Sequence, residues 1–219
     1  MEIVPLGDSA LIVRVDDSLG EVLATMRKLE AANISGVSDI APAFASVALF
    51  LESPEQLEAC REAVRVALGK KRRASGATVK PRVIEVPVCY AAEFAPDLET
   101  VAQHCGLAPN EVVARHAAAR YGVRCVGFTP GFPFLGGLPS KLATPRRKSP
   151  RPAVPAGSVG IGGAQTGIYP LRSPGGWNII GRTPLRLFDV TRDPAALLRA
   201  GDRVRFVSIG REDFEAWDK

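Results

Sequence analysis

The sequence predicts two domains: an α+β domain over residues 1–80, followed by a mainly β domain over residues 81–219. Three observations predict this organisation. Apolar residues before residue 69 switch between the two-residue period of strands and the three-to-four-residue spacing of helices. Residues 69–80 form a polar, basic stretch that is typical of an exposed linker. Residues 127–181 then hold 12 of the 21 glycines and 9 of the 18 prolines, which favours short strands joined by tight turns.

The first domain is predicted to be a small two-layer α+β sandwich. The β-branched run at residues 11–15 and the apolar run at residues 46–51 both predict strands. Residues 18–32 place apolar side chains on one helix face, so this segment predicts a helix. A serine followed by proline at residues 53–54 is typical of a helix start, and this second helix is expected to reach about residue 68. With one further strand, for which no residue range is predicted, the expected order is β-α-β-β-α.

The second domain is expected to open with a strand over residues 82–88. Two short helices follow: the first is capped by Asp97 and ends at Gly106, and the second runs from Pro109 to near Gly122. Apolar and aromatic residues are interleaved among the later glycines and prolines, which indicates a β-barrel or a sandwich. Three segments close the chain: an apolar run, a proline-started turn of helix and a strand, over residues 185–190, 193–198 and 203–209.

The composition limits the class of protein. Hydrophobic residues make up 46% and charged residues 23%, which is ordinary for a soluble globular protein. The N-terminus lacks the pattern of a signal peptide, and no apolar run approaches the ~20 residues that a membrane span needs. We therefore expect a cytoplasmic protein without membrane contact. Only two histidines are present and no C-x-x-C pair occurs, so we expect no metal site and reduced thiols at Cys60, Cys89, Cys105 and Cys125.

The net charge of +5 conceals an asymmetry along the chain. No acidic residue occurs between Glu111 and Asp189, whereas residues 112–188 hold 11 basic residues. The rest of the chain carries 17 basic and 23 acidic residues. The sequence is therefore a mildly acidic protein that contains one strongly basic module.

Two local patterns bear on nucleic-acid and nucleotide binding. Residues 99–122 resemble a helix-turn-helix, but the second helix offers few side chains for reading bases, so two packing helices are favoured and no nucleic acid is expected. A phosphate-binding P-loop is absent, and residues 157–167 do not complete the dinucleotide motif because Gln165 replaces its third glycine. This glycine-rich segment is compatible both with an anion-binding nest and with simple turns.

The region over residues 127–189 is more specific than any of these patterns. It contains the motifs GFTPGFPFL (127–135), LATPRR (142–147), VPAGSVGI (154–161), QTGIYP (165–170) and SPGGWNIIGRTP (173–184). These motifs resemble the signature of the allophanate hydrolase subunit 1 family, also called the KipI or PxpB family. The resemblance covers essentially the whole chain.

The resemblance implies an α+β domain followed by a cyclophilin-like β-barrel. It also implies the B subunit of an ATP-dependent 5-oxoprolinase, which opens 5-oxoproline to glutamate together with an A-type subunit and a C-type subunit resembling allophanate hydrolase subunit 2. ATP and magnesium are then expected in the assembled complex and not on the isolated chain. Two alternatives stay open: inhibition of a sensor histidine kinase, and a part in urea or allophanate hydrolysis.

The basic module lacks the carboxylates that magnesium prefers, so the chain alone is expected to be a poor ATPase. It resembles the electropositive half of a site whose acidic half lies on another chain. His116 is the candidate acid/base group, and Phe132, Phe134 and Trp177 are candidate partner contacts. A structural role is the alternative for each. The residues expected to bind substrate or an anion are Arg146, Gln165, Thr166, Tyr169, Trp177 and Arg182.

Overall fold

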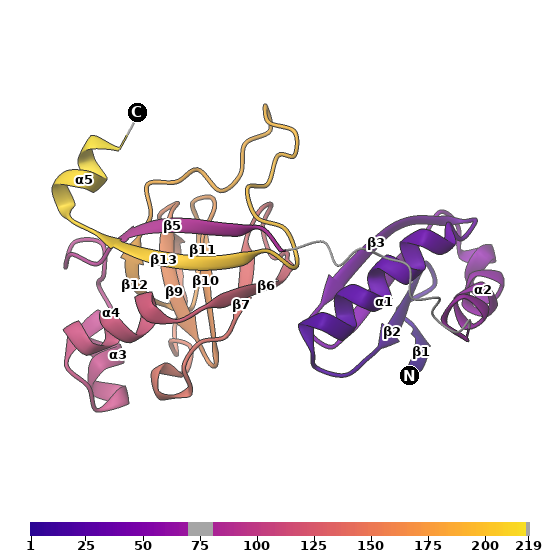
Figure 1. Ribbon diagram of the computed structural model, residues 1–219, viewed down its shortest axis with the longest axis horizontal. Helices are drawn as coiled ribbons and strands as arrows, with labels where there is room; N and C mark the ends of the chain where they lie inside the picture. Colours follow the sequence, from indigo (N-terminus) through magenta and orange to yellow (C-terminus); the bar gives the residue numbers. More distant parts are fainter. Residues whose placement is uncertain (70–80, 218–219) are drawn as a thin grey trace. The chain divides into compact units, whose positions relative to one another are not determined.

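A computed structural model describes residues 1–69 and 81–217 of the chain. It contains two compact units, Met1–Lys80 and Pro81–Lys219 (Figure 1). The basic stretch that the sequence predicts as a linker lies outside the described residues, apart from Gly69. Among the described residues, no helix combines the length and the apolar character needed to cross a bilayer.

The N-terminal unit is an antiparallel sheet with two helices (Figure 1). The sheet order is β1-β2-β4-β3, with β1 (Glu2–Pro5), β2 (Ala10–Arg14), β3 (Val37–Ala43) and β4 (Ser46–Leu51). Helix α1 (Leu19–Ala32) packs on β3 and β4, and α2 (Leu57–Gly69), preceded by the 3-10 turn η1 (Pro54–Gln56), packs on β2. The sheet and both helices share one core, formed chiefly by Leu11, Val13, Val22, Leu29, Val47, Leu49 and Val64.

The segments predicted as strands and helices in this unit have the predicted type, within a few residues at their ends. Strand β3 supplies the third strand of the predicted order, which had no residue range, and β1 was not predicted at all. Strand β1 contributes only Ile3 and Val4 as apolar residues and pairs with β2 alone, so it lacks the alternation that marks a half-buried strand.

The C-terminal unit is built around a closed barrel of seven strands, in the order β10-β7-β6-β13-β5-β12-β9. This confirms the predicted barrel. Strands β5 and β13 run parallel and side by side, whereas the other neighbouring pairs in the barrel are antiparallel (Figure 1). The bounds are β5 (Val83–Cys89), β6 (Tyr121–Val126), β7 (Pro133–Gly136), β9 (Ser158–Gly162), β10 (Gln165–Ile168), β12 (Asn178–Arg182) and β13 (Arg203–Ile209).

Two further strands, β8 (Arg151–Val154) and β11 (Ser173–Gly175), form a separate two-stranded sheet. A short 3-10 turn, η2 (Ser140–Leu142), precedes the basic loop that starts at Thr144. The last helix, α5 (Arg211–Ala216), follows β13 directly.

Helices α3 (Leu98–Cys105) and α4 (Pro109–Ala118) pack on each other and on the barrel strands β12 and β13. The prediction that the second helix extends to near Gly122 is wrong, because the chain enters β6 at Tyr121. Tyr121 is fully buried, and its hydroxyl donates a hydrogen bond of 2.8 Å to the carbonyl of His116. That contact turns the chain from the helix into the barrel.

The predicted helical turn over residues 193–198 is also wrong. The segment runs back along residues 187–189 as an irregular hairpin, with the isolated bridge Phe188–Ala196. The amide of Leu197 donates to the carbonyl of Leu187 at 2.8 Å, and the amide of Asp189 donates to the carbonyl of Ala195 at 2.9 Å. These pairings across the hairpin satisfy the backbone groups that a helix would have paired internally.

Candidate functional site

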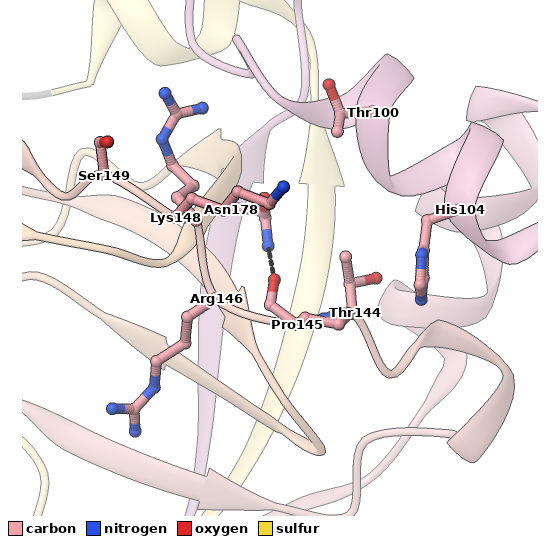
Figure 2. A pocket seen from close by; sticks show the side chains of 9 residues that line it. Thr100, His104, Thr144, Pro145, Arg146, Lys148, Ser149 and Asn178 are labelled. Atoms are coloured by element: carbon pink, nitrogen blue, oxygen red, sulfur yellow. Dashed lines mark hydrogen bonds between the residues drawn. The ribbon is translucent and has the colours of Figure 1, made fainter.

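A basic pocket of about 440 Å³ lies between helix α3 and the loop that follows η2 (Figure 2). The loop supplies one side of the pocket, and Thr100 and His104 on α3 supply the other. The lining contains three cationic side chains and no Asp or Glu: Thr100, His104, Thr144, Pro145, Arg146, Arg147, Lys148, Ser149 and Asn178.

Hydrogen bonds from buried groups fix the path of this loop. The buried side-chain amide of Asn178 donates to the carbonyl of Pro145 at 2.8 Å, which is the dashed contact in Figure 2. The same nitrogen lies 3.2 Å from the carbonyl of Ile161. The amide of Arg147 donates to the carbonyl of Gly176 at 2.8 Å. The loop is therefore attached to strands β9 and β12 and to the turn between β11 and β12.

Asp97 is the acidic residue that pairs with this basic region. Its side chain is 3% exposed, and it accepts hydrogen bonds from Arg147 at 2.9 Å and from both terminal nitrogens of Arg151 at 2.7 and 2.8 Å. The backbone amide of Ile179 donates a fourth hydrogen bond at 2.7 Å. One buried carboxylate thus holds two arginines, which leaves the group with one uncompensated positive charge.

Sequence reasoning missed this role of Asp97. The residue occupies the predicted cap position of α3, but its side chain makes no capping hydrogen bond. An aspartate directly before a helix is the usual pattern of a cap, so nothing local distinguished it. The two arginines lie 50 and 54 residues further along the chain.

Arg146 lies on the exposed rim of the pocket. Figure 2 shows its guanidinium pointing away from Thr100 and His104. The guanidinium carbon is 5.9 Å from the ring centre of Trp177, a cation–π contact that orients the side chain. No ion pair is found for Arg146 among the described carboxylates, so its charge is available to a ligand or a partner.

Trp177 belongs to a buried aromatic cluster behind the loop. It is 5% exposed, Phe132 and Tyr169 are 2% exposed, and Phe134 packs against them. The ring centres of Phe132 lie 5.1 Å from Tyr169 and 5.5 Å from Trp177, both in edge-to-face geometry. Burial also raises the pKa of Tyr169.

Phe132 and Trp177 were expected to contact a partner. Their rings are instead buried in the core, so a partner cannot reach them in this structure. Phe134 is half-buried against the same cluster. The apolar side chain that does reach the surface here is Phe128, which is 66% exposed and stands edge-on to Phe132 at 5.6 Å. Its position in the motif at residues 127–135 gave no sign of which phenylalanine faces outward.

Thr166 and Gln165 lie on β10, outside the basic pocket. Thr166 is fully buried and donates to the carbonyl of Gly160 at 2.9 Å, so a ligand has no access to it in this structure. Gln165 pairs with Gly162 at the hairpin end and is partly exposed. The glycine-rich segment that contains them forms the β9–β10 hairpin, which corresponds to the interpretation as turns.

His116 lies in the barrel core and is fully buried. Its Nδ1 is 2.9 Å from the hydroxyl of Tyr90, its Nε2 is 3.1 Å from the hydroxyl of Thr166, and its ring stacks on Phe206 at 4.5 Å. Burial lowers the pKa of His116 to about 3 and raises that of Tyr90. The imidazole is therefore neutral at physiological pH, and this arrangement favours the structural alternative over an acid/base role.

Arg182 lines a second pocket, of about 690 Å³, and not the basic one. Its Nε donates to the carbonyl of Ala156 at 2.8 Å. Prolines, leucines and aromatic rings, among them Phe188, Phe214 and Trp217, form much of this second pocket. The structure therefore places Arg146 and Arg182 in different pockets.

The described residues contain no group of three His, Cys, Asp or Glu side chains arranged to hold a metal ion. The donor set of the basic pocket fits an anion and does not fit magnesium, which prefers carboxylate oxygens. The four cysteines are free and buried, and burial raises the pKa of Cys125 to about 11, which keeps it a thiol.

The fold and the site define a protein with a small α+β unit and a β-barrel unit, whose barrel carries a basic pocket without carboxylates. The family described as carboxyltransferase domain, subdomain C and D, matches residues 1–198. The chain belongs to this family.

Curated relatives cover nearly the full chain. The B subunit of the 5-oxoprolinase of Bacillus subtilis (strain 168) is 42% identical over 230 residues, which cover 99% of this chain and 96% of that protein. The B subunit of the 5-oxoprolinase of Escherichia coli O157:H7 is also 42% identical, over 207 residues, covering 92% of this chain and 93% of that protein.

A solved structure supports the fold. The crystal structure of TTHA0988 matches with a TM-score of 0.76 and 39% identity over 91% of this chain. The match covers 40% of TTHA0988, so this chain spans less than half the length of that protein.

Proposed function

We propose that this chain is the B subunit of a cytoplasmic 5-oxoprolinase, which opens 5-oxoproline to glutamate with ATP and acts only with A-type and C-type partner subunits. The observation that carries the proposal is a preorganised basic pocket without carboxylates, in a chain 42% identical to proteins named as the B subunit of 5-oxoprolinase. Opening a lactam requires groups that hold anionic reactants and groups that act as acid and base. This chain supplies the first kind.

The pocket is suited to binding and orienting an anionic group of the reactants. Arg146, Arg147 and Lys148 provide positive charge, and Asn178 and Asp97 hold the loop that carries them. Fixed donors stabilise negative charge without having to reorganise during the reaction. ATP supplies the driving force for lactam opening when it is bound, and we assign its magnesium ion to carboxylates of the partner subunits.

The first test is reconstitution. We expect no glutamate release from the isolated chain with ATP and 5-oxoproline, and ATP-dependent release after the A-type and C-type subunits are added. Robust turnover by the isolated chain would refute the requirement for partners. An assembled complex that releases no glutamate would refute the proposed activity.

The second test is the substitution Arg146→Lys in the reconstituted complex. Lysine keeps the charge but loses the planar fork, so we expect kcat/KM to fall by the equivalent of about 1–3 kcal/mol, or roughly 5- to 150-fold. Arg172→Lys is the matched control, because Arg172 is an exposed arginine that lines neither pocket. Arg182→Lys reports on the second pocket. If Arg182→Lys impairs turnover while Arg146→Lys leaves it unchanged, the anion site lies in the second pocket.

A further inference from the structure

We propose that the basic pocket binds a phosphoryl-type oxyanion, a group with at least two negative charges, in preference to a monoanionic carboxylate, and that Asp97 positions the loop that binds it. This inference deepens the proposed function and rests on it for the source of the phosphoryl group.

The donors of the pocket fit a ligand that only accepts hydrogen bonds. The side chains of Arg146, Arg147 and Lys148 carry N–H groups and no acceptor. Thr100 and Ser149 add hydroxyl groups that can donate. A phosphoryl group presents mainly acceptor oxygens, and arginine recognises it through two parallel hydrogen bonds.

The charge of the region favours a ligand with more than one negative charge. Arg146, Arg147 and Lys148 line the pocket, and Asp97 is the carboxylate that pairs with Arg147 and with the neighbouring Arg151. Four cations against one carboxylate leave three positive charges. Glu99, the neighbouring acidic residue on α3, is exposed and does not line the pocket. A monoanionic carboxylate neutralises one of these charges, whereas a phosphate dianion neutralises two.

The loop is held in its binding geometry by contacts behind it. Asp97 is buried and accepts four hydrogen bonds of 2.7 to 2.9 Å, three from the arginines and one from the backbone of β12. The side chain of Arg147 is 36% exposed, so it reaches the pocket while its guanidinium remains tied to Asp97. The loop therefore loses its conformational freedom on folding and not on ligand binding, which favours binding.

The test is calorimetric titration of the full chain at pH 8 with four probes: inorganic phosphate, pyrophosphate, ATP and 5-oxoproline. We expect pyrophosphate and phosphate to bind at one site, at least tenfold more tightly than 5-oxoproline. Their affinity should fall as salt is added, because the Debye length is only about 10 Å at 0.1 M ionic strength. ATP tighter than pyrophosphate identifies a nucleotide as the source. Equal ATP and pyrophosphate affinities identify a phosphoryl group alone.

Substitutions locate the site. Lys148→Met should weaken pyrophosphate binding at least fivefold, whereas its control Lys141→Met, an exposed lysine of the same module outside the pocket, should leave it unchanged. Asp97→Asn separates positioning from simple electrostatics. The loss of a negative charge alone would tighten anion binding, whereas loss of positioning weakens it, and we expect at least tenfold weaker binding.

If Asp97→Asn does not fold, as judged by circular dichroism, the comparison of Lys148→Met with Lys141→Met tests the inference. Preferential binding of 5-oxoproline, or pyrophosphate binding unaffected by Lys148→Met, overturns the inference. If the chain binds pyrophosphate but the assembled complex releases no glutamate, the anion site is supported and the proposed function is refuted. If the complex releases glutamate but the full chain binds no phosphate, the proposed function is supported and this inference is overturned.

Discussion

At the scale of single residues, two buried polar side chains organise the barrel unit. Asp97 is ionic and holds arginines from two other segments, whereas His116 is neutral and hydrogen-bonds to Tyr90 and Thr166. Burying a polar group costs free energy unless its hydrogen bonds are made, so the core depends on the hydrogen-bond partners of both residues. Burial lowers the pKa of His116, so this imidazole gains a proton on unfolding in acid.

The pH response of His116 gives the first prediction. In the unfolded chain an imidazole takes up a proton as the pH falls through about 6.5, whereas in the folded chain its pKa is held at about 3. The unfolded state therefore binds more protons below pH 6.5, and stability falls as the pH falls. We expect the free energy of unfolding of the wild type to drop by about 1.4 kcal/mol per pH unit between pH 6 and 4, relative to His116→Gln.

The measurement is urea denaturation at several pH values, and the second histidine provides the control. His104 is exposed and lines the basic pocket, so His104→Gln should retain the wild-type pH dependence. Parallel pH profiles for the wild type and His116→Gln would mean that the imidazole is accessible to protons in the folded state. That result would return His116 to the candidates for acid/base catalysis.

At the scale of elements, glycines of β9, β10 and β11 leave room for aromatic rings to pack against the backbone. A Cβ atom added at Gly162 on β9 would lie 2.6 Å from the indole nitrogen of Trp177. At Gly167 on β10 the added atom would lie 3.0 Å from the ring of Phe132, and at Gly175 it would collide with the hydroxyl oxygen of Tyr169. The glycine density of this region thus reflects aromatic packing as well as turns.

This packing predicts the effect of Gly162→Ala. The indole of Trp177 is buried among rings and carries Arg146 on its face, so it has little room to move. Overpacking of this kind typically costs about 1–3 kcal/mol, and we expect a loss of that size in thermal or urea denaturation. Gly127→Ala is the control, because nothing lies within 4 Å of its added Cβ, and it should stay within roughly 0.5 kcal/mol of the wild type. An unchanged stability of Gly162→Ala would show that the indole relaxes.

At the scale of the whole molecule, charge is unevenly distributed between the two units. Both units expose large apolar side chains, but the barrel unit also contains the basic module and exposes the aromatic ring of Phe128 at 66%. Exposed aromatic side chains beside charged groups are typical of protein interfaces. We therefore expect the barrel unit to provide most of the contact with the partner subunits.

The corresponding prediction concerns Phe128. Replacing it by serine in the full chain should weaken association with the partner subunits at least tenfold, because an exposed aromatic anchor is lost and no core contact other than its edge on Phe132 changes. Phe50→Ser is the matched control, since Phe50 is 41% exposed on β4 of the N-terminal unit. Surface plasmon resonance measures both affinities. A larger effect from Phe50→Ser would place the contact on the N-terminal unit.

Local patterns determined much of the fold. The helix faces in residues 18–32, the strand at residues 203–209 and the turn chemistry of residues 127–181 each appear as the predicted kind of structure. These features depend on neighbours within a few positions, so spacing and composition are sufficient to predict them. The mispredicted segments are those whose structure is decided by pairing: Tyr121, just after α4, pairs with Val204 on β13, and residues 195–197 pair with residues 187–189.

The sequence by itself therefore determined the two-unit order, the barrel class and the basic character of one module. Only the tertiary structure decided which residues of that module meet: it gathers Arg147 and Arg151 on Asp97, separates Arg146 from Arg182, and buries Thr166, Tyr169 and Trp177. The physical reason is that burial and ion pairing depend on three-dimensional proximity. The chemistry of a side chain follows from the residue type, but its exposure and its partners are set only when the barrel folds.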